Sequence, residues 1–512
     1  MRRRAACARR GRCGRIARSG GRPYAAGPAP RFDRTPRPPV TTRPARSRSA
    51  RPSVRGFVRR RVCWTAPALL APALALGLAT PGCEPEGADD SALVAERDAA
   101  LAERDALKVR VATLEADGGG ADLDPLLEAL RNAGATVTED GGVVTAVSMP
   151  ATSSTNAAHL LPLLLMPELK TLTLGGPSFD DEAMAVVGKL TGLERLDISG
   201  TPVSNDGLAK LSGLTNLKVL RLKTVSVDDL TPLEGMTELR ELDVRFSNVG
   251  DAAMDSVAKL PNLSALKLER SAVTDDGLQK LSAEQPLRVL DLDTGFSDPL
   301  PILAEKGYTD LRALELDRTD IYGAEGFAPL KQFKELRLLS LQEAYPYDED
   351  LQPVLGELTN LESLNLRQTP VTNALMPTVG ELTNLKTLNL AEVSAVTEPG
   401  LKELAPLTKM EDLDLWATGA TDATMTEVIA GFENLTALSL QQTKVGDEGL
   451  KALADLKQLE RLDLSETQVT DESVAVLKAL PNLQSLTLKN TEITSEGVAE
   501  LQEANPDLNI VK

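Results

Sequence analysis

Leucines recur through most of the chain in one short pattern, Leu-x-x-Leu-x-Leu, which is clearest at Leu459, Leu462 and Leu464. Residues two apart in an extended strand point to the same side of it. Leu462 and Leu464 would therefore face a core, and Asp463 would face solvent. The pattern predicts a short strand with one buried face.

A helix is predicted directly after this strand. Val474, Leu477 and Leu480 recur at threes, which is typical of a short amphipathic helix. Thr470 precedes two acidic residues, an arrangement that suits a helix N-cap with acids in the first turn. The stretch from 459 to 480 is thus a unit of strand, turn and helix.

The same unit repeats every 22 to 25 residues. Its first leucine is Leu169, Leu193, Leu217, Leu239, Leu263, Leu287, Leu311, Leu336, Leu361, Leu385, Leu435, Leu459 and Leu483, with Met410 in that place once. A degenerate copy begins at Val144, and a truncated strand, residues 508–511, ends the chain. One unit buries too few aliphatic side chains to offset the entropy of ordering it, so the units must stack.

The repeated pattern LxxLxLxxTxVTDxGLxxLxxL resembles the leucine-rich repeat over about 370 of the 512 residues, with threonine where many family members carry a ladder asparagine. Most units are similar to ribonuclease-inhibitor-like or bacterial repeats. Residues 225–239 and the LTNL segments at Leu358 and Leu382 are similar to internalin-type repeats. The resemblance implies an α/β solenoid, a right-handed horseshoe with a parallel sheet on the concave face and short helices outside.

The chain begins with an arginine-rich extension. Residues 1–61 contain 20 arginines and one acid, Asp33, without an apolar period, which predicts disorder. A nucleic-acid-binding arm is one interpretation. The other is a leader that is removed, or a start assigned too early.

The apolar run that follows favours removal. Residues 62–82 have the pattern of a signal peptide after Arg59, Arg60 and Arg61, and residues 79–83 (ATPGC) resemble a bacterial lipobox with Cys83 as the acylated residue. A permanent membrane helix is the second choice, because the run contains two prolines and is short for a bilayer.

Cysteine usage and charge divide at the same place. Of the four cysteines, only Cys83 lies beyond the leader, so the mature chain would have no disulfide. Removing residues 1–82 would leave 36 Lys and Arg against 73 Asp and Glu, a net charge of −37. Such a chain should repel nucleic acid and anionic surfaces.

The remaining organisation is a tether and a repeat domain. Residues 83–120 are predicted to form a lipid tether and a short helical stalk ending in three glycines, either solvated or in a coiled coil. Residues 121–150 are predicted to form an N-terminal cap, with a helix over 126–133, and the degenerate first repeat. Residues 151–512 make the leucine-rich repeat domain.

Catalytic and cofactor signatures are few. His159 is the only histidine, and its apolar surroundings suggest a packing or surface role. We find no phosphate-binding glycine loop and no serine elbow, so we expect no cofactor and no enzyme activity. Paired carboxylates leave a hydrolase as a remote alternative.

The repeat pattern predicts which side chains line the concave face, namely those at the third, fifth, seventh and eighth positions, counted from the first leucine. A basic cluster stands there: Arg195, Arg221, Lys223, Arg245, Lys267 and Arg270, with Phe246 among them. These bases would seat an anionic peptide, glycan or phosphate-bearing group, or they would balance Asp197 and Asp243 on the same strands.

Acidic residues follow on the next strands. Glu269, Asp293 and Asp317 stack at the seventh position, and Asp291 and Glu315 stack at the fifth. Like charges at that spacing should raise one another's pKa. Asp291, Asp293 and Asp317 are weak candidates for a calcium site, whereas Arg270 and Arg318 offer the pairs that a purely structural interpretation needs.

Aromatic residues supply the remaining candidate contacts. Trp416 falls at a seventh position, where a tryptophan is costly to leave wet, so it either contacts a partner or packs on a neighbour. Tyr345 and Tyr347 would line the rim of the horseshoe.

We therefore expect an exported, membrane-anchored lipoprotein of the cell envelope that binds another macromolecule through its concave face. The partner implied by the resemblance is most often a protein, with a peptide or glycan as alternatives. The rival interpretation is an envelope spacer with no dedicated ligand.

Overall fold

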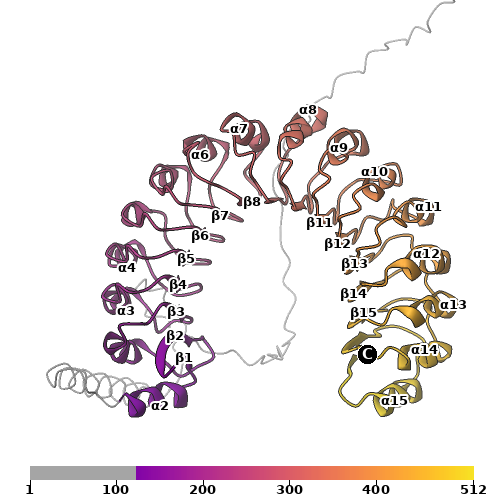
Figure 1. Ribbon diagram of the computed structural model, residues 1–512, viewed down its shortest axis with the longest axis horizontal. Helices are drawn as coiled ribbons and strands as arrows, with labels where there is room; N and C mark the ends of the chain where they lie inside the picture. The colour runs from indigo at the N-terminus through magenta and orange to yellow at the C-terminus, as the bar shows by residue number, and fades with distance from the viewer. Residues whose placement is uncertain (1–122) are drawn as a thin grey trace, which may run out of the picture. The chain divides into compact units, whose positions relative to one another are not determined.

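The structure, a computed structural model, describes residues 123–512. The predicted arginine-rich extension, the signal peptide, Cys83 and the stalk lie outside these residues. The described chain curves into an open arc with strands along its inner side and short helices along its outer side (Figure 1). The α/β leucine-rich repeat solenoid expected from the leucine spacing is confirmed.

The strands form one sheet of 17 strands within the described residues. They are β1 (Thr136–Asp140), β2 (Val143–Met149), β3 (Thr171–Leu174), β4 (Arg195–Asp197), β5 (Val219–Arg221), β6 (Glu241–Asp243), β7 (Ala265–Lys267), β8 (Val289–Leu292), β9 (Ala313–Leu316), β10 (Leu338–Ser340), β11 (Ser363–Asn365), β12 (Thr387–Asn389), β13 (Asp412–Asp414), β14 (Ala437–Ser439), β15 (Arg461–Asp463), β16 (Ser485–Thr487) and β17 (Asn509–Val511). From β2 to β17 each strand pairs in parallel with the next, and fourth-position leucines face one another, as Leu462 faces Leu486.

The α-helices cover the outer side of the arc (Figure 1). They are α2 (Asp124–Asn132), α3 (Asp181–Val187), α4 (Asn205–Ala209), α5 (Met254–Val257), α6 (Asp275–Lys280), α7 (Pro299–Glu305), α8 (Gly323–Phe327), α9 (Asp348–Leu355), α10 (Met376–Gly380), α11 (Glu398–Lys402), α12 (Asp422–Glu427), α13 (Asp447–Leu450), α14 (Val474–Lys478) and α15 (Ser495–Ala504). Seven short 3₁₀ segments, η1 (Ala157–Leu165), η2 (Thr231–Leu233), η3 (Asp251–Ala253), η4 (Ala328–Gln332), η5 (Ile429–Gly431), η6 (Lys451–Asp455) and η7 (Asp471–Ser473), complete the outer layer.

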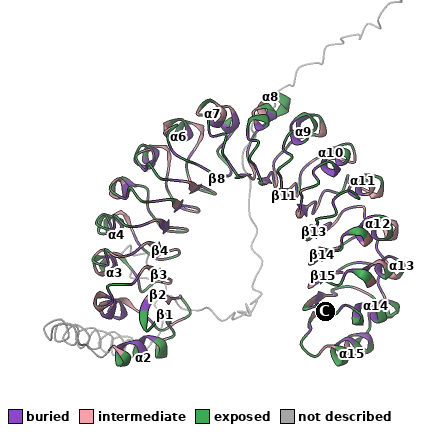
Figure 2. Cartoon of the chain, viewed as in Figure 1, coloured by how far each residue is buried: buried purple, intermediate pink, exposed green. Residues whose placement is uncertain are grey.

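The core is a continuous leucine stack between the sheet and the helices, drawn as the buried interior of the arc in Figure 2. Leu459, Leu462 and Leu464 are each at most 2% exposed, as the pattern predicts. Val474 and Leu477 reach the same core from α14. Thr470 is the N-cap of η7, and its side chain accepts a hydrogen bond from the Glu472 amide. Each unit thus buries its leucines only against its two neighbours.

The N-terminal end contains a hairpin that the sequence analysis did not anticipate. The predicted cap helix is present as α2, but β1 then pairs antiparallel with β2 through a turn at Gly141 and Gly142. Alternating residues on either side of two glycines are the usual signal for such a hairpin. The exposed side chains of β1 are threonines and acids, which discourages edge-to-edge pairing of the sheet.

The threonine at the ninth position closes its own turn and does not form a ladder between repeats. Thr467 Oγ1 donates to the Leu464 carbonyl at 2.6 Å, and the equivalent threonines repeat this bond. Asparagines just before the first leucine form the ladder instead, each donating to a carbonyl of the preceding repeat at 2.8 to 3.3 Å. They are Asn216, Asn262, Asn360, Asn384, Asn434 and Asn482.

An aspartate at the start of many helices joins consecutive repeats on the outer side. Asp251 accepts from the Thr274 amide at 2.7 Å and from its hydroxyl at 2.9 Å, and Asp447 binds Thr470 in the same way. A Cβ on Gly277 would lie 2.5 Å from the Asp251 carboxylate, so that position accommodates only glycine without a shift. This explains the TDxG part of the repeat.

The eighth position adopts a left-handed backbone in almost every repeat. Eleven non-glycine residues have φ between 52° and 62°, and each stands at this position, from Thr224 to Asn490. The repeat that begins at Leu287 is the exception, because its left-handed residue is Gly295, one place later. A side chain held at positive φ costs about 1–2 kcal/mol, yet most of these positions keep one.

Candidate functional site

The concave face divides into two halves by its charge. In the six repeats from Leu193 to Leu311, the charged half, 11 of the 12 side chains at the fifth and seventh positions are charged. In the seven repeats from Leu336 to Leu483, the polar half, 4 of these 14 are charged and most others are Ser, Asn, Gln or Thr. The two halves therefore offer different chemistry to a partner.

Arg245 organises the first part of the charged half. Its Nη2 lies 2.7 Å from Asp243 Oδ2, and its Nη1 lies 3.9 Å from Glu269 and 3.8 Å from Asp291. The hydrogen bonds to Asp243 raise the pKa of Arg245. Asp243 is 2% exposed, so this guanidinium neutralises a buried acid.

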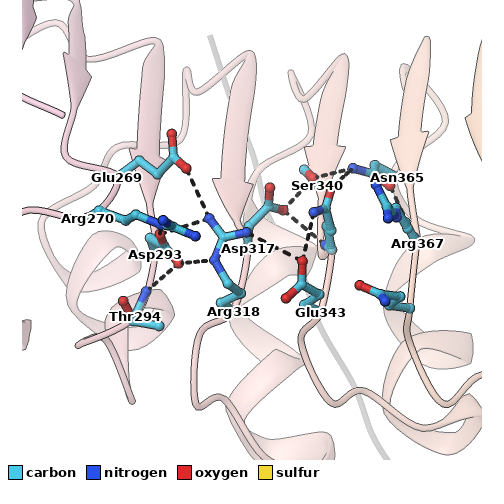
Figure 3. A network of polar contacts seen from close by, with 12 residues as sticks. Glu269, Arg270, Asp293, Thr294, Asp317, Arg318, Ser340, Glu343, Asn365 and Arg367 are labelled. Atoms are coloured by element: carbon cyan, nitrogen blue, oxygen red, sulfur yellow. Dashed lines mark hydrogen bonds and ion pairs between the residues drawn. The ribbon is translucent and has the colours of Figure 1, made fainter. Parts of the chain in front are cut away.

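Arg318 organises the second part, where the two halves meet (Figure 3). Its guanidinium donates to Asp293 at 2.8 and 2.9 Å and to Glu269 at 3.0 Å, and it lies 3.6 Å from Glu343. Asp293 is fully buried. The bond to Asp293 raises the pKa of Arg318, so the cation is held firmly in its charged state.

The acids next to these two arginines have raised pKa values. Burial, and then the neighbouring Glu315, raises the pKa of Asp291 to about 7. Burial also raises the pKa of Glu315 and of Asp317, although Asp317 accepts a hydrogen bond from the Ser340 hydroxyl. For these three of the five stacked acids the direction of the pKa shift is as predicted, but loss of hydration is the larger cause and like-charge repulsion the smaller one.

The three weak candidates for a calcium site each have a different partner within the protein. Asp293 binds Arg318, Asp317 accepts from Ser340 and from the Gln342 amide, and Asp291 lies beside Arg245. Within residues 123–512, no group of three or more His, Cys, Asp or Glu side chains is arranged to hold a metal ion. His159 is buried, and its Nδ1 accepts from the Asn156 amide at 3.2 Å.

The predicted basic cluster is largely neutralised by its own neighbours. Arg221 lies 3.1 Å from Glu241 and 4.0 Å from Asp197, and Lys267 lies 4.0 Å from Glu241. Lys223 and Arg270 flank the Phe246 ring, at 5.1 and 5.3 Å from its centroid, and Arg270 also lies 3.9 Å from Asp293. The structure thus favours the interpretation in which these bases balance acids on the same and adjacent strands.

Trp416 contacts side chains of two other repeats, one two repeats before it and one directly after it, and stays partly exposed. The Arg367 guanidinium lies 5.1 Å from its ring centroid, and the indole N–H donates to Gln442 at 3.4 Å. Of the two roles predicted for Trp416, contact with a partner or packing within the chain, the structure shows the packing. Its outer edge remains available on the polar half of the face.

A hollow of about 750 Å³ opens where the two halves meet, beyond the C-terminal ends of the strands. It is lined by Thr294, Arg318, Asp320, Glu343, Tyr345, Gln368, Thr369, Pro370 and Glu392. Tyr345 is 53% exposed and its ring stacks on Tyr322 with 6.4 Å between centroids. Tyr347 is 54% exposed but does not line the hollow.

Of the residues singled out from the sequence, Arg318 and Tyr345 line this hollow. Glu343 and Glu392 were missed although they stand at the outward eighth position of their repeats. Tyr322, which stacks on Tyr345, was missed because it stands in a turn beyond the leucine pattern. The displaced turn at Gly295 was the available signal, since it interrupts the regular eighth position where the hollow begins.

Comparison with known proteins agrees with this architecture. Residues 301–496 match the family described as leucine-rich repeat region. A search of curated proteins finds no match. No helix in residues 123–512 combines the length and apolar character needed to cross a bilayer.

Several solved structures are similar at low identity. An internalin from Listeria monocytogenes is 20% identical, over 72% of this chain and 86% of that one, with a TM-score of 0.35. A leucine-rich repeat protein from Leptospira interrogans is 20% identical, over 69% and 92%, with a TM-score of 0.42. The ectodomain of a plant membrane receptor kinase from Arabidopsis thaliana, solved with a Casparian strip integrity factor, is 16% identical, over 68% and 56%, with a TM-score of 0.36.

Proposed function

We propose that this protein is a membrane-tethered, extracytoplasmic scaffold that binds another protein through its concave face, without catalysis. The observation that carries the proposal is the hollow beside Tyr345. It joins a stacked, exposed aromatic pair to carboxylates and amides that converge from several repeats. Exposed aromatic side chains next to a hollow are the features that most often contribute binding energy in protein interfaces.

The polar half extends this surface. Ser340, Asn365 and Asn389 line a smaller recess of about 380 Å³, together with Glu315 and Asp317. Amides and hydroxyls offer hydrogen bonds without the cost of stripping water from a full charge. A partner that lies along the polar half would thus meet Tyr345 at one end and Trp416 farther along.

Site-specific photo-crosslinking tests this assignment. We would place a benzoyl-phenylalanine at position 345 of the full chain, and at position 347 as the matched control, because the two tyrosines are almost equally exposed. We expect a protein adduct from position 345 that is absent from position 347. Equal labelling from both positions, or none from either, would contradict binding at the hollow and leave the spacer interpretation.

The tether is a separate part of the proposal, supported by the signal-peptide pattern of residues 62–82 and the lipobox-like segment before Cys83. Labelling cells with radioactive palmitate tests it. We expect incorporation into the full chain and none into the Cys83→Ser variant. Equal incorporation into both chains would overturn the anchor while leaving the binding surface untested by that result alone.

A further inference from the structure

A single file of side chains runs along the edge of the sheet where the strands begin. These residues occupy the second position of each repeat. The backbone amide of each one donates to the carbonyl of the second-position residue before it, as Arg288 does to Ser264, Arg312 to Arg288 and Arg337 to Arg312, at 2.7 to 2.8 Å. Neighbouring side chains in this file therefore start about 5 Å apart.

Two glutamates of this file are each shared by the bases on either side of them. Glu194 lies 3.9 Å from Lys170 and 2.7 Å from Lys218. Glu362 lies 2.9 Å from Arg337 and 3.2 Å from Lys386. Each glutamate thus neutralises the bases on both sides of it.

Between Glu194 and Glu362 the file contains no other acidic residue. Arg240, Arg288 and Arg312, which we call the arginine row, are exposed, and no carboxylate of residues 123–512 lies within 4.0 Å of their guanidinium nitrogens. Only Ser264 separates Arg240 from Arg288. Like charges on adjacent strands destabilise a sheet, and this chain has 62 acids against 32 bases over the same residues with which to neutralise them.

We propose that the arginine row binds a short acidic segment of a partner protein. Guanidinium groups pair with carboxylates through two parallel hydrogen bonds. An extended segment presents side chains to one face about every 7 Å. This spacing falls between the about 5 Å and about 10 Å that separate arginines one and two strands apart, and the long, flexible arginine side chains make up the difference. Glu194 and Glu362 bound the row at either end, so a long polyanion such as a nucleic acid meets repulsion where a short acidic segment does not.

This site is distinct from the hollow. The arginine row precedes the strands, whereas the residues that line the hollow follow them. Binding at the row therefore goes beyond the proposed function, and variants of Tyr345 should leave it unchanged. Failure at one surface says nothing against the other.

Fluorescence anisotropy with labelled decaglutamate and the full chain tests the proposal. The triple variant Arg240→Gln, Arg288→Gln, Arg312→Gln should bind the peptide at least tenfold more weakly. The control Lys170→Gln, Lys218→Gln, Lys386→Gln changes the net charge equally but removes bases that already share a glutamate, so its affinity should stay within about threefold. Equal losses in the two variants, or no binding by the unmodified chain, would overturn the proposal.

A gain of binding provides an independent check. Glu362→Gln releases Arg337 and Lys386 and lengthens the unpaired row, so decaglutamate should bind at least threefold more tightly. An unchanged or weaker affinity contradicts the site. A single-stranded oligonucleotide of thirty residues should bind more weakly than decaglutamate, and tighter binding of the oligonucleotide that is lost in the triple variant would overturn the assignment to an acidic peptide.

Discussion

The charged half and the polar half of the concave face are built on the same leucine pattern and use their outward positions differently. In the charged half, Arg245 and Arg318 bind acids that are almost completely buried. In the polar half, amides and hydroxyls stand beside open recesses, and the ion pair between Arg461 and Asp412 is exposed. A high density of charge on the concave face therefore reflects ion pairs within the protein. The surface that can bind a partner lies where polar groups keep their access to solvent.

The two halves should differ most in how much stability is lost when one arginine is removed. Arg318→Ala removes both guanidinium hydrogen bonds to the buried Asp293 and leaves it only the more distant and exposed Arg270, at 3.9 Å. We expect the free energy of unfolding to fall by about 3–5 kcal/mol. Arg461→Ala removes a pair that is 59% and 46% exposed, for which about 1 kcal/mol or less is expected. Urea denaturation followed by circular dichroism measures both, and similar losses would show that the charged half is no more internally paired than the polar half.

The pH dependence of stability should also differ between the two halves. Since the pKa of Asp291 is about 7 in the folded chain and about 3.9 in an unfolded one, the folded state holds the extra proton between these values. Its contribution to the free energy of unfolding is present below pH 4 and is lost as the pH rises towards 7. Asp291→Asn should remove this slope and stabilise the protein at pH 8 by at most about 4 kcal/mol.

Asp463 is the matched control for this measurement, because it occupies the same fifth position in the polar half. We would compare urea unfolding of both asparagine variants with the unmodified chain from pH 4 to pH 8. If Asp291→Asn follows the same curve as the unmodified chain, the burial of carboxylates in the charged half has been misjudged.

The outer side of the two halves should respond alike, which confines their difference to the concave face. Gly277→Ala and Gly449→Ala each place a Cβ 2.5 Å from an aspartate of the preceding repeat. We expect both to lower the free energy of unfolding by about 1–3 kcal/mol. Gly235→Ala meets nothing within 4 Å and should stay within about 0.5 kcal/mol; a large difference between the first two variants would mean that the halves differ in their scaffold as well.

The leucine spacing predicts the scaffold because each leucine position is decided locally. Whether Leu462 is buried depends on the period of two in a strand, and Leu477 depends on the spacing of threes in a helix. The sequence also places Arg245, Arg270 and Asp293 on one face, and the structure brings them there. Even the unforeseen hairpin at Gly141 and Gly142 had a local signal.

The state of the site depends on distances between repeats, which the repeat pattern does not contain. Whether Arg318 is free or paired is decided by its reach to Asp293 and Glu269, one and two repeats away. The hollow brings together eighth-position side chains of several repeats, among them Arg318 and Glu343, with Tyr345 from a turn beyond the pattern. Prediction from the sequence therefore identifies the outward side chains but not which of them are already engaged.

Some of these ion pairs skip a repeat, as Arg318 does when it reaches Glu269 49 residues back. In an array where each coil touches only the coils beside it, melting starts at an end and advances one coil at a time. A side chain that grips three coils forces them to separate together. The repeats in the middle of the arc should accordingly unfold as one cooperative unit and be the last to exchange their amide hydrogens.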